Sequence, residues 1–143
     1  MVMRVSRRIL PLLLLALAAA CSDSPTSATS TPGFTSTDVR PGAGSDVAPG
    51  NVLTVHYTGW LFDAAKTEQK GLQFETSRGG DGFAFTLGAG QVISGWDEGL
   101  VGMKLGGLRR LVIPPALAYG TSRNGSIPPN ATLVFEIELV AVQ

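Results

Sequence analysis

The sequence predicts one α+β domain in which a curved antiparallel β-sheet wraps around one short amphipathic helix. Three observations support this fold class. Several segments alternate apolar and polar residues with the two-residue period of half-buried strands. One segment repeats apolar residues at three- and four-residue steps, as an amphipathic helix does. Eighteen glycines and nine prolines among 143 residues supply the many turns that such a sheet needs.

The strand period is clear in two early segments, residues 52–58 and 83–87. Because neighbouring side chains of a strand point to opposite faces, each segment is expected to have a buried and an exposed face. Tyr57 falls on the buried face, and His56, the only histidine of the chain, falls on the exposed face. The residues expected to point inward from these strands are Leu53, Val55, Tyr57, Phe83, Phe85 and Leu87.

A short helix is predicted next along the chain. Its apolar residues recur at steps that place them on one side of a helix. Ser94 followed by Asp97 is typical of an N-cap pair, and Gly102 and Gly106 lie where a helix is expected to end. The apolar side of the helix consists of Ile93, Trp96, Leu100 and Met103.

Two more strands are predicted after the helix. Residues 108–113 form one, which ends at Pro114 because proline has no N–H to donate to a strand ladder. Residues 133–142 alternate over their whole length and form a long strand. Its inner face carries Leu133, Phe135, Ile137, Leu139 and Ala141.

The N-terminal region is expected to direct export. Residues 1–20 combine Arg4, Arg7 and Arg8 with an apolar run and three alanines, as secretory signal peptides do. The apolar run is too short to span a bilayer comfortably. Cys21, the only cysteine, follows the alanines directly, and this arrangement resembles the lipobox of bacterial lipoproteins.

The lipobox resemblance implies that Cys21 is lipidated and becomes the N-terminus of the mature protein. It places the protein in the bacterial cell envelope, and Ser22 favours the periplasmic side of the outer membrane. An ordinary secreted protein with an incidental cysteine is the alternative, and a twin-arginine signal is a weaker option. Residues 21–36, rich in Ser, Thr, Pro and Ala, are expected to form a flexible linker, and residues 37–143 the folded domain.

Charge and composition exclude several kinds of function. The formal net charge is zero, and it becomes −3 once residues 1–20, with three arginines and no acidic residue, are removed. Nucleic-acid binding therefore has no basic patch to support it. One histidine and one cysteine provide neither a hydrolase triad nor a zinc or haem site, so no metal and no cofactor are expected.

Several motifs, taken in order, resemble the FKBP family of peptidyl-prolyl cis/trans isomerases. The resemblance covers about residues 48–142 and implies the same fold as the strand and helix patterns do. It implies action on proline-containing polypeptides and binding of macrolide inhibitors. A monomer is expected because no dimerisation segment precedes the predicted domain. The motifs are VHYTG at 55–59, Phe-x-Thr-Ser at 74–77, VISGWDEGL at 92–100, AYG at 118–120 and IPPNATLVFEIEL at 127–139.

The resemblance also implies which residues form the active site. Trp96 would be the floor of an apolar pocket. The family tyrosine at the position of Tyr119 donates its hydroxyl to a substrate carbonyl, and the backbone N–H of Ile93 donates to a second carbonyl. Ile127 would lie on a flap at one rim, and Phe85 is expected at the pocket edge or in the core. The pocket walls would be Tyr57, Phe83, Val92, Ile93 and Phe135.

Two positions depart from the family pattern. The resemblance also implies that Phe74 and Glu75 belong to the site, but the family commonly has aspartate after this phenylalanine, where the residue here is Glu75. An arginine that pairs with the pocket tyrosine in the family falls on about Gly80, and Arg78 is expected to be out of register. Residues 63–72 are interpreted as an insertion that forms a surface helical turn.

The resulting hypothesis is an isomerase that accelerates X-Pro rotation during the folding of exported proteins. The expected mechanism is desolvation and turn stabilisation in an aromatic pocket. Rotation about an X-Pro bond is slow because it breaks amide resonance, with a barrier of ~18–20 kcal/mol. The alternative hypothesis is a non-catalytic module that binds proline-containing peptides with reduced turnover, because the polar side of the pocket is altered.

Overall fold

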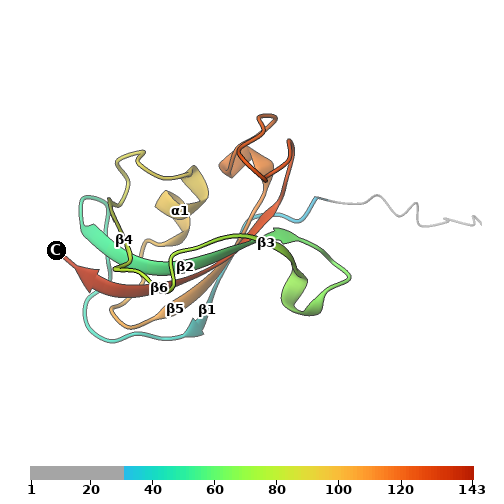
Figure 1. Cartoon of the computed structure of the whole chain (residues 1–143). Coiled ribbons are helices and arrows are strands. Elements are labelled where there is room, and N and C mark those ends of the chain that lie inside the picture. Colours follow the sequence, from blue (N-terminus) through green and yellow to red (C-terminus); the bar gives the residue numbers. More distant parts are fainter. Residues whose placement is uncertain (1–30) are drawn as a thin grey trace, which may run out of the picture.

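The computed structural model describes residues 31–143 and confirms an antiparallel sheet curved around one short helix (Figure 1). The strands are β1 (Thr35–Arg40), β2 (Val52–Phe62), β3 (Lys70–Thr76), β4 (Phe83–Thr86), β5 (Leu108–Ile113) and β6 (Leu133–Val142). The helix α1 spans Ser94–Gly99, and two short 3₁₀ turns cover Thr67–Gln69 and Pro115–Leu117. The strand order of the six-stranded sheet is β1-β5-β6-β2-β3, and β4 pairs with β2.

The strands β2 and β6 form the centre of the sheet, with Tyr57 opposite Ile137. β2 continues to Phe62, beyond the predicted segment 52–58. The physical reason is that its edge opposite β6 has a partner along both halves, since β4 pairs with the first half and β3 with the second. The long, curved β2 therefore carries Tyr57 to the middle of the concave face.

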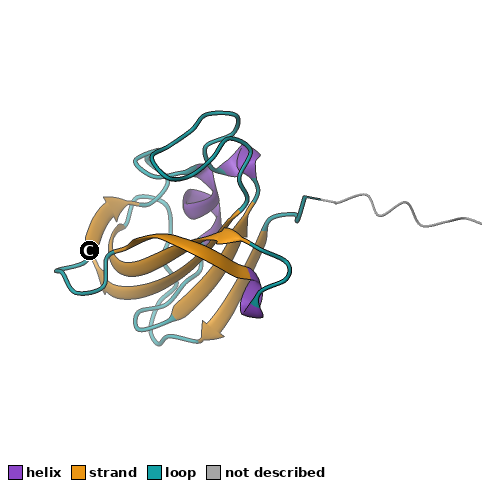
Figure 2. Ribbon diagram, turned by 45° about the vertical axis from the view of Figure 1, so that its right-hand side comes forward, coloured by secondary structure: helices purple, strands orange, loops and turns teal. Residues whose placement is uncertain are grey.

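The helix α1 packs against the concave face of the sheet, and together they enclose the core (Figure 2). Two glycines let the helix approach β5 closely. A Cβ atom on Gly95 would lie 2.5 Å from Cγ2 of Ile113, and one on Gly99 would lie 2.8 Å from Cδ2 of Leu111. Neither distance leaves room for a methyl group, so the glycines allow Trp96 to lie deep against the sheet.

The start of α1 differs from the predicted N-cap pair. Ile93 occupies the N-cap position and makes no side-chain capping hydrogen bond. The carboxylate of Asp97 instead accepts hydrogen bonds from the N–H groups of Gly88, at 2.8 Å, and Gly90, at 3.2 Å. Both glycines have positive φ, so the turn leaves their N–H groups without strand partners, and Asp97 satisfies them. The predicted Ser94–Asp97 cap is therefore wrong, and Asp97 fixes the turn that precedes the helix.

The strand β1 was not predicted from the sequence. It begins at Thr35, inside the segment 21–36 that was expected to be a linker and ahead of the expected domain start at residue 37. All its residues are exposed, so its sequence carries no apolar alternation. It pairs with β5 through the backbone, with a bulge between Asp38 and Arg40. Residues 1–20, Cys21 and the linker up to residue 30 lie outside the described residues.

A buried arginine ties β1 to the rest of the fold. Arg109 of β5 is 8% exposed, and its Nε and Nη2 donate to the two carboxylate oxygens of Asp38 at 2.7 and 3.2 Å. Its Nη1 donates to the carbonyls of Gly99 and Val101, both at 2.9 Å. The arginine thus joins β1 to the C-terminal end of α1. The strand and helix periods of the sequence do not predict these contacts.

The segment 63–72 contains a surface turn and the start of a strand. The segment Thr67–Gln69 forms an exposed turn, but Glu68 and Gln69 have positive φ, at 54° and 59°, so the turn is not the regular helical turn that was expected. Lys70 already belongs to β3. The Lys70 ammonium lies 2.5 Å from the Glu136 carboxylate and 4.6 Å from the ring centroid of Trp60. Within residues 31–143, no helix is long and apolar enough to cross a membrane.

Candidate active site

The indole of Trp96 lies at the centre of an aromatic cluster. Its ring centroid is 4.9 Å from that of Tyr57 and 5.3 Å from that of Phe135, and both contacts are edge-to-face. Phe85 and Phe83 of β4 lie further out, at 5.7 and 6.3 Å. The rings come from β2, β4, β6 and α1, which confirms that the fold brings these distant sequence positions together.

A hollow of about 230 Å³ opens above this indole. The ring itself is only 4% exposed, so it forms the floor of the hollow and also part of the core. All the residues expected as floor and walls line this hollow, together with Glu75, Tyr119 and Gln91. The full lining is Tyr57, Glu75, Phe83, Gln91, Val92, Ile93, Trp96, Tyr119 and Phe135.

A second hollow of about 330 Å³ adjoins the first and shares Glu75 and Tyr119 with it. Phe74 and Ile127, which were expected at the same pocket, line this second hollow instead. Phe74 packs edge-on against Phe135, with ring centroids 5.6 Å apart. The remaining lining residues are Asn124, Gly125 and Ser126.

The loop that carries Ile127 is held in a tight turn. The backbone N–H of Asn124 donates to the carbonyl of Ile127 at 3.1 Å, and the N–H of Ile127 donates back at 2.8 Å. Ile127 is 5% exposed, so it anchors the loop to the core while the residues before it face the second hollow.

The two tyrosine hydroxyls at the hollows remain protonated well above neutral pH. Burial, and after it the neighbouring Glu75 carboxylate, raises the pKa of Tyr57 from 10.0 to about 12. Burial and the charge of Glu75 also raise the pKa of Tyr119, and the Asn124 side chain opposes this change. Both hydroxyls can therefore donate a hydrogen bond to a carbonyl oxygen at physiological pH.

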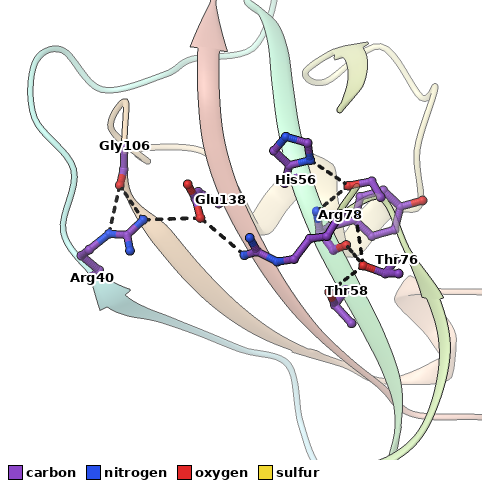
Figure 3. A network of polar contacts seen from close by, with 9 residues as sticks. Arg40, His56, Thr58, Thr76, Arg78, Gly106 and Glu138 are labelled. Carbon is purple, nitrogen blue, oxygen red and sulfur yellow. Dashed lines mark hydrogen bonds and ion pairs between the residues drawn. The ribbon is translucent and has the colours of Figure 1, made fainter. Parts of the chain in front are cut away.

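The arginine nearest in sequence to Glu75 does not reach the hollows. Arg78 points to the convex side of the sheet, where its Nη2 lies 3.4 Å from Oε2 of Glu138 (Figure 3). The same oxygen lies 3.5 Å from Nη2 of Arg40. Gly80 lies in an exposed turn. Among residues 31–143, Glu75 therefore forms no ion pair.

His56 lies outside the aromatic cluster, on the outward face of β2. Its Nδ1 is 3.5 Å from Oγ of Ser77, at the margin of a hydrogen bond (Figure 3). Among residues 31–143, no serine, cysteine or histidine lines the aromatic hollow. Its chemistry is therefore that of apolar surface, two hydroxyl groups, one carboxylate and the amide of Gln91.

Sequence reasoning missed three polar lining residues and left the place of one aromatic residue open. Gln91 lines the first hollow, and its Oε1 accepts from the N–H of Thr86 at 2.8 Å. A polar residue directly before the Val92–Ile93 pair was the available signal. Asn124 and Ser126 line the second hollow, and the sequence Asn124-Gly125-Ser126 is typical of a turn, so it gives no signal for a site. Phe85 is 3% exposed and lines neither hollow, so it belongs to the core.

Comparison with known proteins assigns this architecture to a family. The family model described as FKBP-type peptidyl-prolyl cis-trans isomerase matches residues 44–140. The chain belongs to this family. The match begins after β1 and covers β2 to β5, most of β6, α1 and the residues that line both hollows.

Relatives of FKBP type agree with this assignment. The FK506-binding protein of Neisseria meningitidis serogroup B is 47% identical over 107 residues, which are 73% of this chain and 92% of that protein. FK506-binding protein 2B of Rhizopus delemar is 53% identical over 96 residues, which are 66% of this chain and 43% of that protein. The chain is thus an enzyme that catalyses peptidyl-prolyl cis-trans isomerisation.

Solved structures of the family show the same fold. FkpA from Escherichia coli matches with a TM-score of 0.66 and 41% identity, over 78% of this chain and 48% of the FkpA chain. The peptidyl-prolyl cis-trans isomerase of Pseudomonas syringae pv. tomato matches with a TM-score of 0.64 and 38% identity, over 77% of this chain and 75% of that one. This chain thus spans about half the length of FkpA.

Proposed function

We propose that the hollow over Trp96 binds the proline ring and accelerates rotation of the preceding amide by removing it from water. At the twisted midpoint the amide has lost resonance and is less polar than either planar isomer. An apolar hollow therefore disfavours the planar forms more than the midpoint. The observation that supports this proposal is the open space of about 230 Å³ above an indole that is surrounded by other rings.

Two polar groups at the hollow would orient the substrate. The hydroxyl of Tyr119 would donate to one substrate carbonyl and the backbone N–H of Ile93 to another. Both residues line the hollow, and the N–H of Ile93 precedes the first turn of α1, where backbone donors have no partner within the helix. A millionfold acceleration needs a barrier reduction of only about 8 kcal/mol, which desolvation and orientation can supply without covalent chemistry.

A pair of tryptophan variants tests this proposal. Trp96→Leu is expected to lower kcat/KM for an X-Pro peptide by about tenfold or more, because it removes the floor of the hollow. Trp60→Leu removes the other indole, on the opposite face of the sheet, and is expected to leave kcat/KM within about twofold of the parent. Exchange between cis and trans peptide, followed by NMR, measures both values.

The same assay separates an enzyme from a module that only binds. Circular dichroism must show that both variants are folded. Equal kcat/KM for the two variants would remove Trp96 from the mechanism. Exchange no faster than the blank in the parent chain, with peptide affinity retained, would favour the binding module.

We also propose that the hollow binds macrolides of the FK506 type. The relatives are named as FK506-binding proteins, and the aromatic residues around Trp96 offer the apolar surface that such a ligand needs. Competition between FK506 and an X-Pro peptide, measured by the loss of isomerase activity, tests the shared site.

For the cell, we propose an isomerase anchored by an acylated Cys21 that assists the folding of exported proteins, on the periplasmic side of the outer membrane. The support is the sequence of residues 1–21, with its basic start, apolar run and single cysteine. Mass spectrometry of the mature N-terminus is expected to show acylation of Cys21. A free Cys21 thiol, or an N-terminus at another residue, would overturn the anchor.

A further inference from the structure

The carboxylate of Glu75 stands where the two hollows meet. Glu75 and Tyr119 are the two residues that line both hollows. Glu75 is exposed, and the pKa of both neighbouring tyrosines is raised in part by its negative charge, so the carboxylate lies close to both hydroxyls. A ligand that fills both hollows must therefore lie next to the Glu75 carboxylate.

No cation of the described chain neutralises Glu75. Arg78 pairs with Glu138 on the convex side, and Lys70 pairs with Glu136 and Glu68. Arg123 is next to Asn124 in the loop, but it lines neither hollow and forms no ion pair within residues 31–143. The carboxylate is therefore available to a charge that a substrate brings.

The second hollow suits a long side chain with an apolar stem and a cationic end. Phe74 and Ile127 offer apolar surface, while Asn124 and Ser126 are polar and Glu75 is charged. Lysine and arginine bury their methylene stems on apolar surface and keep the charged group at a polar edge. Consecutive Cα atoms are about 3.8 Å apart, so a residue next to a proline in the first hollow can place its side chain in the second.

We propose that Glu75 makes this isomerase selective for substrates with lysine or arginine next to the proline. The proposal rests on the proposed function, since it requires that the proline ring occupies the hollow over Trp96. The carboxylate acts as a specificity residue, because it attracts the neighbouring side chain of the substrate and takes no part in the rotation itself.

Peptides that differ at one position test the proposal. Two series carry Lys, Gln or Glu either directly before or directly after the proline, and NMR exchange gives kcat/KM for each peptide. At low salt, Lys is expected to exceed Gln by about threefold and Glu by about tenfold in one of the two series, the range set by exposed charge pairs. In about 1 M NaCl, where the screening length falls to about 3 Å, the ranking is expected to collapse.

Charge variants assign the selectivity to one residue. Glu75→Gln is expected to abolish the ranking, whatever it does to the absolute rates. Glu98→Gln removes an exposed carboxylate of α1 that lines neither hollow, and it is expected to keep the ranking. Arg123→Gln is expected to keep Lys as the preferred residue.

The outcomes separate the two proposals. Equal kcat/KM for Lys and Gln in both series would overturn the selectivity and leave the isomerase intact. A ranking that survives in Glu75→Gln, or a preference for Glu that depends on Arg123, would overturn it as well. A parent chain that accelerates none of the peptides would instead refute the proposed function.

Discussion

Tyr119 and Tyr57 bring the two hydroxyl groups to the hollow, and they have different surroundings. Tyr57 packs edge-to-face against Trp96 and lies near the Glu75 carboxylate, while Tyr119 follows the 3₁₀ turn Pro115–Leu117 and lines both hollows. A hydroxyl in a largely apolar site contributes mainly to orientation, since each such bond has a modest net free energy.

The variant Tyr119→Phe is expected to weaken FK506 binding by about 1 kcal/mol, the net contribution of a neutral hydrogen bond. Isothermal titration calorimetry should show a dissociation constant about fivefold higher. Melting temperature serves as the control for folding. Unchanged affinity would show that the Tyr119 hydroxyl makes no bond to the ligand.

The raised pKa of Tyr57 predicts a loss of stability at high pH. The hydroxyl ionises at about 12 in the folded chain and near 10.0 when unfolded, so folding favours its neutral form. The contribution of this pKa difference to the free energy of unfolding is complete below pH 10 and is lost as the pH rises toward 12. Urea unfolding across this range is expected to show a smaller decline for Tyr57→Phe than for the parent. Equal declines would contradict the assignment.

Among single residues, the sequence predicted the aromatic lining better than the polar lining. Large rings at regular strand positions announce a buried face, so Tyr57, Phe83 and Phe135 could be placed from alternation alone. Gln91 and Asn124 lie in turns, where a polar residue is as easily solvated as it is part of a site. The position of a hollow depends on the space that packed side chains leave between them. The strand and helix periods of the sequence give no information about that space.

At the scale of elements, the start of α1 and the strand β1 were not predicted correctly, because both depend on hydrogen bonds to other segments. The capping pair predicted for α1 was wrong because the Asp97 carboxylate instead accepts hydrogen bonds from two N–H groups of the preceding turn. The strand β1 escaped prediction because it buries almost no side chain and is held by the backbone of β5 and by Arg109.

The neighbouring arginines Arg109 and Arg110 are expected to differ sharply in their contribution to stability. Arg109→Met leaves carbonyls at the end of α1 without their donor and separates Asp38 from its partner, which should lower the free energy of unfolding by about 2–3 kcal/mol. Arg110 lies on the opposite face, and its Nε and Nη2 are buried without a partner within residues 31–143.

Arg110→Met is therefore the matched control, expected to change the free energy of unfolding by less than about 0.5 kcal/mol. Urea denaturation measures both variants. An equal decrease in the free energy of unfolding in Arg110→Met and Arg109→Met would show that the hydrogen bonds of Arg109 to β1 and α1 do not stabilise the fold specifically.

For the whole molecule, the fold class could be predicted because local patterns and global fold agree. Strand periods, the helix period and the turn residues all indicate a sheet around one helix, and the family comparison reaches the same fold independently. The strand order could not be derived from the periods, because β5 lies between β1 and β6 although these three strands are distant in sequence.

The free edge of the sheet at β1 has a consequence for the proposed role in the folding of other proteins. An edge strand offers a row of unpaired backbone N–H and C=O groups to any extended polypeptide, and unfolded proteins contain many extended segments. Here that row is interrupted by an irregular step between Asp38 and Arg40 and flanked by charges of both signs. Such features discourage foreign strands from extending the sheet. In the proposed role, an edge of this kind would protect the enzyme from pairing with the unfolded polypeptides on which it acts.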